Sequence, residues 1–162
     1  MIQHGHSSFF TVYIIWEKLG RIAVIGGGSW ATAIAKMVLA KQDQINWYIH
    51  RQDRIDEFIA KGHNPAYLTN VSFDTKRINF SADINETIKS AKTIIFATPS
   101  PYLNDTLAQL TVDLKDKFII TGIKGIIPGK NLIISDFFVE NYGLKPEQIS
   151  VIAGPCHAEE VA

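Results

Sequence analysis

The sequence predicts an α/β fold: a doubly wound, mainly parallel sheet with helices on both faces. Short apolar segments alternate along the chain with segments whose apolar residues recur every three or four positions. The apolar segments are continuous, as expected of strands that are buried on both faces. A cluster of glycines follows the first of them. Strands that alternate with helices form parallel sheets joined by right-handed crossovers, which is the predicted architecture.

The first predicted strand, residues 22–25, leads into three glycines and then into an alanine-rich helix. Gly26 allows a sharp turn, and Gly28, which lacks a Cβ atom, allows a diphosphate to approach the backbone. Ala31 occupies the third small position of a G-x-G-x-x-A pattern, where the helix packs closely on the strand. The first helical turn offers unpaired N–H groups to an anion. The pattern therefore favours a nucleotide site of a Rossmann-like fold over an ordinary glycine turn.

The first helix should begin at Ser29 or Trp30 and end near residues 41–42, because its apolar residues follow helical spacing. Its apolar face is predicted to consist of Ala31, Ile34, Ala35, Val38 and Leu39. Residues 45–49 are rich in β-forming side chains and predict the second strand.

A second helix is expected over residues 53–61 and should end at Gly62. Its predicted inward face consists of Ile55, Phe58 and Ile59. Residues 63–73 are expected to form a loop, in which Asn64 and Pro65 are the turn signal.

The rest of the chain continues the alternation. Strands are expected at residues 78–80, 93–97, 118–120 and 149–153, and helices at residues 83–90 and 132–142. Pro99 and Pro101 should stop one strand and begin another helix. The predicted inward face of that helix consists of Tyr102, Leu103, Leu107 and Leu110.

The composition excludes several classes of protein. The 162 residues, 46% of them hydrophobic, suffice for one domain with a sizeable core. Sixteen basic and sixteen acidic residues balance, so the chain has no net positive charge that would attract nucleic acid or an anionic membrane. A single cysteine excludes an internal disulfide framework and indicates a reducing cytosol. No apolar run reaches the roughly 18 residues of a membrane span.

Residues 1–20 form a leader whose role the sequence leaves open. Residues 9–16 are apolar and aromatic, but no Lys or Arg precedes them and no small-residue cleavage site follows, unlike in a signal peptide. The leader could be an added strand, an irregular extension, the product of an upstream start codon, or a contact with a second chain in a homo-oligomer. The nucleotide-binding domain is expected to be residues 21–162.

The end of the second strand decides which dinucleotide fits. An acid there holds the ribose hydroxyls of NAD, and a cation pairs with the extra phosphate of NADP. His50 and Arg51 occupy this position. Arg51 can bind a phosphate through two hydrogen bonds and stack on adenine, so we interpret it as a cofactor residue rather than a solvated surface arginine. This interpretation favours NADP(H). Asp53, two residues on, keeps NAD(H) as the alternative.

Two further residues beside the glycines have open roles. Trp30 could lie beside the diphosphate or be a core tryptophan under the sheet. Lys124, between Gly122 and Gly125, could bind a substrate phosphate, act as an acid–base group, or be a surface lysine.

Residues 154–158, GPCHA, offer a different chemistry. A cysteine between a strand and a helix is similar to a nucleophile elbow, and a helix N-terminus lowers the pKa of a thiol. A cysteine hydrolase would, however, need an oxyanion motif and a third partner, which the sequence does not show. Cys156 is otherwise a small packed residue and His157 a surface or capping residue.

Six segments together carry a family resemblance. They are residues 25–33 (IGGGSWATA), 50–51 (HR), 64–68 (NPAYL), 96–100 (FATPS), 123–126 (IKGI) and 154–162 (GPCHAEEVA). In order and spacing they resemble the bacterial-type NAD(P)-dependent glycerol-3-phosphate dehydrogenases. The resemblance extends from about Arg21 to Ala162.

The resemblance implies the reversible reduction of dihydroxyacetone phosphate to sn-glycerol 3-phosphate, in the cytoplasm and for phospholipid synthesis. The residues it implies for the cofactor are Gly26, Gly28, Ser29, Trp30, His50, Arg51, Lys124 and Ala158. Those it implies for the substrate are Lys124, Gly154 and Cys156. A Rossmann module that only senses nucleotides is the alternative function.

Three features depart from the family pattern. Ala31 replaces a usual third glycine, and Cys156 stands where serine or threonine is more usual, so that a thiol replaces a hydroxyl. The family's catalytic lysine, which protonates the substrate oxygen, belongs to a helical second domain, and no residue of this chain matches it. We therefore expect that domain beyond Ala162 and expect this chain alone to be inactive.

Overall fold

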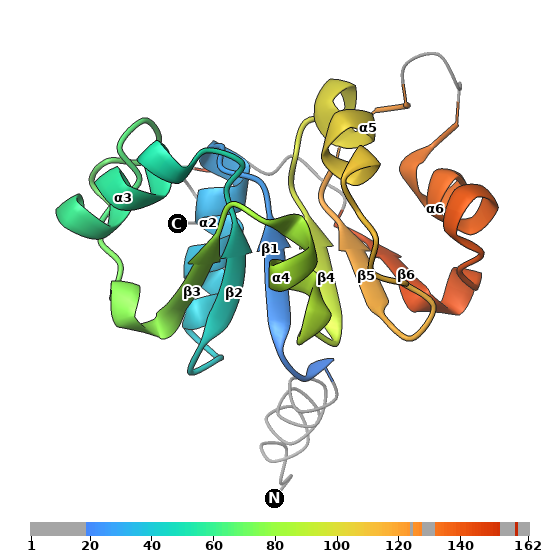
Figure 1. Cartoon of the computed structure of the whole chain (residues 1–162), viewed down its shortest axis with the longest axis horizontal. Helices are drawn as coiled ribbons and strands as arrows, with labels where there is room; N and C mark the ends of the chain where they lie inside the picture. Colours follow the sequence, from blue (N-terminus) through green and yellow to red (C-terminus); the bar gives the residue numbers. More distant parts are fainter. Residues whose placement is uncertain (1–18, 124, 128–131, 153–157, 159–162) are drawn as a thin grey trace, which may run out of the picture.

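The structure is a computed structural model that describes residues 19–123, 125–127, 132–152 and 158. These residues contain a six-stranded sheet in which every pair of neighbouring strands is parallel (Figure 1). The strand order is β3-β2-β1-β4-β5-β6. The strands are β1 (Ile22–Ile25), β2 (Ile45–Tyr48), β3 (Ile78–Ser81), β4 (Thr93–Phe96), β5 (Phe118–Thr121) and β6 (Ile149–Val151). The predicted doubly wound α/β fold is confirmed.

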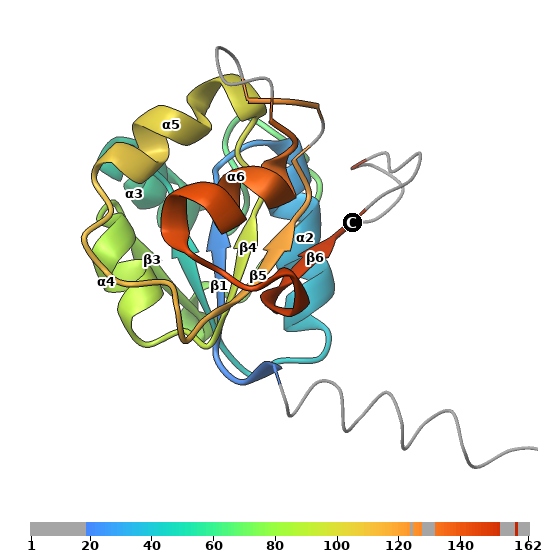
Figure 2. The ribbon, with the colours of Figure 1, turned by 90° about the vertical axis from the view of Figure 1, so that its right-hand side faces the viewer.

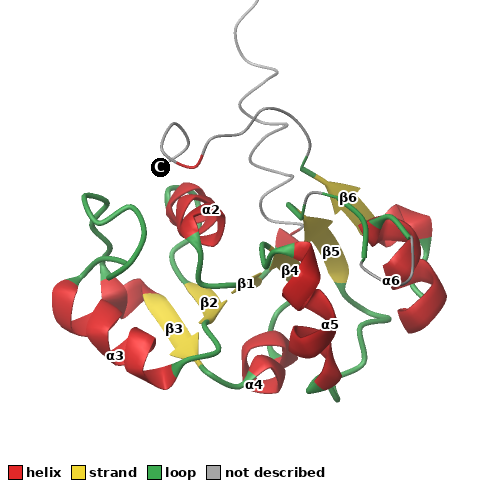
Figure 3. Cartoon of the chain, turned by 90° about the horizontal axis from the view of Figure 1, so that it is seen from above, coloured by secondary structure: helices red, strands yellow, loops and turns green. Residues whose placement is uncertain are grey.

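Helices cover both faces of this sheet. Seen from above, α2 lies on one face and α4 and α5 lie on the other (Figure 3), and the side view shows the same layers (Figure 2). The helices are α2 (Ser29–Leu39), α3 (Gln52–Lys61), α4 (Ile84–Lys89), α5 (Ser100–Ala108) and α6 (Ile134–Tyr142). Within the described ranges, no helix is long and apolar enough to cross a membrane.

Two hydrophobic cores explain why the strands are continuously apolar. Ala23 and Ile25 of β1 belong to the core under α4, α5 and α6, whereas Ile22 and Val24 belong to the core under α2 and α3. All four side chains are fully buried. Because successive side chains of a strand point to opposite faces, each face of β1 needs its own apolar set.

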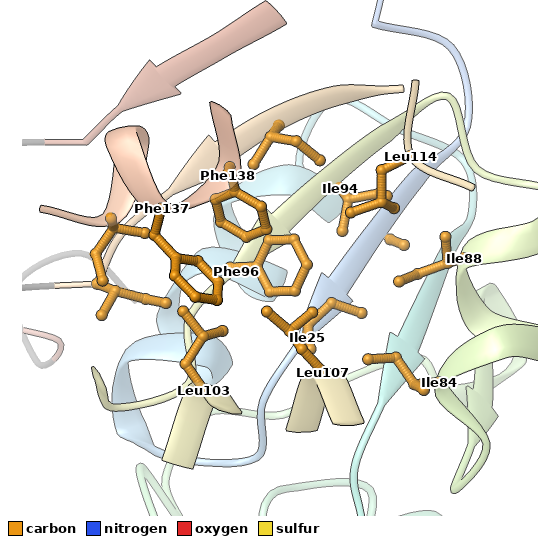
Figure 4. Packing of buried hydrophobic residues seen from close by; sticks show 14 of the residues in the cluster. Ile25, Ile84, Ile88, Ile94, Phe96, Leu103, Leu107, Leu114, Phe137 and Phe138 are labelled. Carbon is orange, nitrogen blue, oxygen red and sulfur yellow. The ribbon is translucent and has the colours of Figure 1, made fainter. Parts of the chain in front are cut away.

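The core under α4, α5 and α6 is centred on aromatic rings. Phe96 of β4 faces Phe137 and Phe138 of α6, with Leu103 of α5 beside them (Figure 4). The ring centroids of Phe96 and Phe138 are 4.9 Å apart. This packing holds α5 and α6 against the end of β4.

The core under α2 and α3 is centred on Trp47 of β2. Its ring centroid lies 5.3 Å from that of Phe58 and 5.6 Å from those of Phe73 and Phe80. The indole Nε1 donates a hydrogen bond of 2.7 Å to the carbonyl oxygen of Gly26. A buried tryptophan therefore fixes the backbone at the point where β1 ends.

Two side chains that helical spacing predicted to be buried are exposed. Ile59 is 50% exposed, although Ile55 and Phe58 of the same helix are buried, because α3 sits at the outer edge of the sheet and covers it with a narrow stripe. Tyr102 is 62% exposed, because it faces a cleft rather than the core, whereas Leu103 is fully buried as predicted.

The other boundaries agree with the prediction to within about three residues. The αL conformation of Gly62, with φ +70°, ends α3 as expected. Asp83 caps α4 by accepting a hydrogen bond of 2.7 Å from the amide of Asn85. The expected end of the last strand, Ala153, lies outside the described residues.

Candidate functional site

A cleft of about 630 Å³ opens where β1, β2 and β4 end. The strand order reverses between β1 and β4, and in such sheets ligands bind beyond the carboxyl ends at this switch point. The cleft is lined by Gly26, Gly27, Gly28, Tyr48, Ile49, His50, Arg51, Arg54, Phe58, Asn64, Pro65, Ala66, Tyr67, Thr98, Pro99, Tyr102, Asp105, Thr106 and Gln109. The first three of these residues form a glycine turn at its floor.

The glycines of this turn are required for different reasons. Gly26 has φ +131°, and a Cβ atom there would lie 3.1 Å from the carbonyl carbon and oxygen of Ala97. The fold itself therefore requires glycine at position 26. Gly28 has φ −83° and ψ −175°, and a Cβ atom there would meet nothing within 4 Å. The packing of the protein leaves the space beside Gly28 open.

Helix α2 begins at this open glycine. Gly28 is the N-cap and supplies no side-chain cap, and the first turn contains no acidic residue. The first helical hydrogen bond runs from the amide of Thr32 to the carbonyl oxygen of Gly28, at 3.0 Å. The amides of residues 29–31 precede that bond, and they carry the positive end of the helix dipole. This arrangement suits an anion.

Basic side chains line the cleft where β2 ends. His50, Arg51 and Arg54 are all part of the lining. Arg51 forms a two-point ion pair with Asp53, whose Oδ1 accepts a hydrogen bond of 3.0 Å from the Arg51 Nε. This hydrogen bond lowers the pKa of the Asp53 carboxyl. Arg54 contacts Glu57 at 3.3 Å. Both arginines at the mouth of the cleft thus lie next to an acid of α3.

Trp30 and Ser29 do not belong to the cleft lining within the described chain. The Trp30 ring packs against the core under α2 and α3. A Cβ atom on Gly122, after β5, would lie 2.4 Å from the indole Nε1, so the ring lies directly against this glycine. Among the described residues, the buried Nε1 has no hydrogen-bond partner.

Three predicted site residues, Lys124, Gly154 and Cys156, lie outside the described residues. Ala158 is described and is 8% exposed. Within the described ranges, no group of three or more His, Cys, Asp or Glu residues could hold a metal ion.

The structure adds Asn64, a residue of the predicted turn and of the 64–68 family segment to which the sequence analysis assigned no role in the site. Asn64 is 3% exposed and uses both ends of its side-chain amide. Its Nδ2 donates to the carbonyl oxygen of Gly27 at 3.1 Å and to the Thr32 hydroxyl at 2.8 Å. Its Oδ1 accepts from the amides of Ala66 and Tyr67 at 3.0 and 3.1 Å. The local part of this pattern is an Asx turn, which Asn before Pro could have indicated.

Comparison with known proteins identifies the family. The family described as NAD-dependent glycerol-3-phosphate dehydrogenase N-terminus matches residues 21–162. The chain belongs to this family. Among curated relatives, the glycerol-3-phosphate dehydrogenase [NAD(P)+] of Prosthecochloris aestuarii is 33% identical over 143 residues, which are 87% of this chain and 43% of the relative. The corresponding protein of Bacillus licheniformis is 32% identical over 143 residues, 87% of this chain and 41% of the relative.

Solved structures of glycerol-3-phosphate dehydrogenases share the fold. The Coxiella burnetii protein superposes with a TM-score of 0.73 at 26% identity, over 88% of this chain and 43% of that one. The Plasmodium falciparum protein gives 0.76 at 23% identity, over 93% and 45% of the two chains. The chain thus spans less than half the length of its dehydrogenase relatives. Family membership favours the dehydrogenase hypothesis over the nucleotide sensor and the cysteine hydrolase.

Proposed function

We propose that this chain binds a nicotinamide dinucleotide in the cleft and serves the reversible reduction of dihydroxyacetone phosphate to sn-glycerol 3-phosphate in the cytoplasm, for phospholipid synthesis. One observation carries the proposal: α2 begins at Gly28 inside the cleft, with neither a side-chain cap nor a Cβ atom in front of its first amides. A diphosphate fits this position because it is anionic and needs close contact with the backbone. The names of the curated relatives include NAD(P)+.

In this proposal, Gly26, Gly28 and the first turn of α2 hold the diphosphate, and His50 and Arg51 hold the adenosine end. Trp30 supports the site from outside the cleft, because its ring packs the start of α2 against Gly122. The further assignments come from the family motifs: Ser29, Lys124 and Ala158 to the cofactor, and Lys124, Gly154 and Cys156 to the substrate. When bound, the dinucleotide supplies the hydride, and the residues of this chain orient it.

The catalytic lysine is proposed to lie outside the segment that matches the family, in a helical second domain. The relatives are more than twice as long as the matched segment, since that segment is 43% of the Prosthecochloris protein. A division of labour follows, in which these residues bind the cofactor and the other domain supplies the proton and completes the substrate pocket.

Binding without turnover is the expected behaviour of the 162-residue chain. Titration with NADPH should change the tryptophan fluorescence, because Trp47 contacts the glycine turn directly. The same sample should not oxidise NADPH when dihydroxyacetone phosphate is added, whereas the full gene product should. Absence of binding would contradict the proposed cofactor site, and measurable reduction by the 162 residues would contradict the division of labour.

We further propose that NADP(H) is preferred to NAD(H). The side chains that line the cleft at the end of β2 are His50, Arg51 and Arg54. Asp53, the acid that could hold the ribose hydroxyls of NAD, instead pairs with Arg51 and does not belong to the described lining. Basic groups in the cleft lining at this end of β2, and the absence of Asp53 from the described lining, favour a ribose phosphate.

Replacing Arg51 by glutamine should weaken NADP(H) binding by about tenfold or more and NAD(H) binding by less than about threefold. Arg21→Gln is the matched control, because Arg21 bonds Gln44 at the other end of β1. Asp53→Asn should strengthen NADP(H) binding, by no more than about fivefold because exposed ion pairs are weak. Isothermal titration with both dinucleotides measures these changes. Equal losses for the two dinucleotides in Arg51→Gln would contradict the preference.

A further inference from the structure

The loop after α3 is attached to the glycine turn through one buried side chain. Asn64 donates to the Gly27 carbonyl oxygen and to the Thr32 hydroxyl, and the Thr32 hydroxyl in turn donates to the Gly28 carbonyl oxygen at 2.8 Å. The Asn64 amide therefore contacts both the glycine turn and the first turns of α2. Buried amides with all their hydrogen-bonding groups in use hold their surroundings in one arrangement.

The same side chain shapes the adjoining wall of the cleft. Residues 64–67 all line the cleft. The Asn64 Oδ1 accepts hydrogen bonds from the amides of Ala66 and Tyr67. The backbone of this turn is strained, because Leu68, which follows Tyr67, has φ +49°. A branched residue in this left-handed region is strained and persists where other contacts determine the backbone. Tyr67, 47% exposed, is thereby kept at the mouth of the cleft.

We propose that Asn64 is a positioning residue of the dinucleotide site, which sets the separation between the glycine turn and the wall formed by residues 65–67. The proposal rests on the proposed function, since the cleft is taken to receive the diphosphate of NAD(P)(H). Asn64 itself lies behind the turn, bonded to the carbonyl oxygen of Gly27. It acts on the ligand through the backbone of the turn and through Tyr67.

Asn64→Asp tests this role because aspartate keeps the shape and the acceptor but changes the donor. The ionised carboxylate cannot donate to the Gly27 oxygen, whereas the protonated carboxyl has one O–H donor. Burial favours the neutral form of such a carboxyl, so a larger share of it should be protonated, and able to donate, as the pH falls. The variant should bind NAD⁺ about tenfold more weakly than the wild type at pH 8 and recover part of this loss near pH 5.5.

NAD⁺ is the appropriate probe, because it lacks the ribose phosphate that itself titrates near neutral pH. His50 lines the cleft and His63 adjoins Asn64, so each affinity is expressed relative to the wild type at the same pH. Asn64→Ala, with no donor at any pH, should lose affinity about equally across the range. Thr32→Val removes one partner of Asn64 and should cost a smaller, roughly two- to fivefold loss.

Thermal unfolding of each variant separates positioning from simple stability. If all three variants melt at lower temperature but bind NAD⁺ within twofold of the wild type at every pH, Asn64 is only a structural residue and the inference is overturned. If Asn64→Asp and Asn64→Ala do not fold, the same comparison of melting temperature and NAD⁺ affinity is made with Thr32→Val alone. A wild-type chain that binds no dinucleotide would instead refute the proposed function.

Discussion

Replacing Gly28 by aspartate is expected to abolish dinucleotide binding without lowering the stability of the fold. The backbone there is extended, and a Cβ atom would meet nothing within 4 Å, so the side chain enters open space. Aspartate is a favourable N-cap and interacts well with the helix dipole. Its carboxylate would accept hydrogen bonds from the same amides that the diphosphate needs. The negative charge of the carboxylate would also repel the diphosphate. The loss of affinity for NADPH should exceed about 100-fold.

Gly28→Ser separates the two causes of this loss. Serine adds the Cβ atom and a capping hydroxyl but no charge, so it should weaken binding less than aspartate does. The melting temperatures of both variants should stay within about 3 °C of the wild type. Fluorescence titration gives the affinities, and circular dichroism gives the melting curves. If the aspartate variant bound NADPH within threefold of the wild type, the diphosphate would not lie at the start of α2.

The sheet and its switch point could be predicted because the signals for them are local. A strand buried on both faces is apolar at every position, as in residues 22–25, and the glycine turn marks where it meets its helix. The strand order was not specified by any residue. It follows from a general property of alternating strands and helices, which leaves few ways to pair them.

Side-chain burial on the helices was predicted less well because it depends on tertiary position. Helical spacing gave Ile55, Phe58 and Ile59 one common face, but it could not say that α3 lies at an edge where part of that face meets solvent. Tyr102 likewise satisfied the helical spacing of α5 but faces the cleft. Periodicity identifies an apolar stripe, and only the packed neighbours decide how much of it is covered.

Contacts between distant segments were beyond sequence reasoning altogether. Asn64 bonds the Gly27 carbonyl across 37 positions, and Trp47 bonds the Gly26 carbonyl across 21. Neither partner has a side chain, so no pairing of residue types could have indicated these bonds. The glycines were identified by what they lack, while the residues that hold them in place are visible only in the folded chain.

Gly26→Ala should be the most destabilising substitution in the site. At φ +131° an L-residue is strained, and the added Cβ would lie 3.1 Å from the Ala97 backbone and 3.2 Å from the Thr98 amide nitrogen. The Ala97 backbone cannot easily move, because its amide donates to the Ile25 carbonyl oxygen at 2.9 Å. We expect a loss of about 2–4 kcal/mol in the free energy of unfolding, about 5–15 °C in melting temperature.

Gly143→Ala is the matched control for backbone conformation alone. Gly143 also has positive φ, +62°, but a Cβ atom there would have its nearest neighbour, the Lys115 Cε, at 4.0 Å. Gly143→Ala should therefore lower the free energy of unfolding by only about 1 kcal/mol, the usual penalty for alanine in the left-handed conformation that ends a helix. Urea unfolding of the two variants compares them. Equal losses would mean that the clash with the backbone after β4 contributes nothing, and that the turn after β1 can shift to admit a side chain.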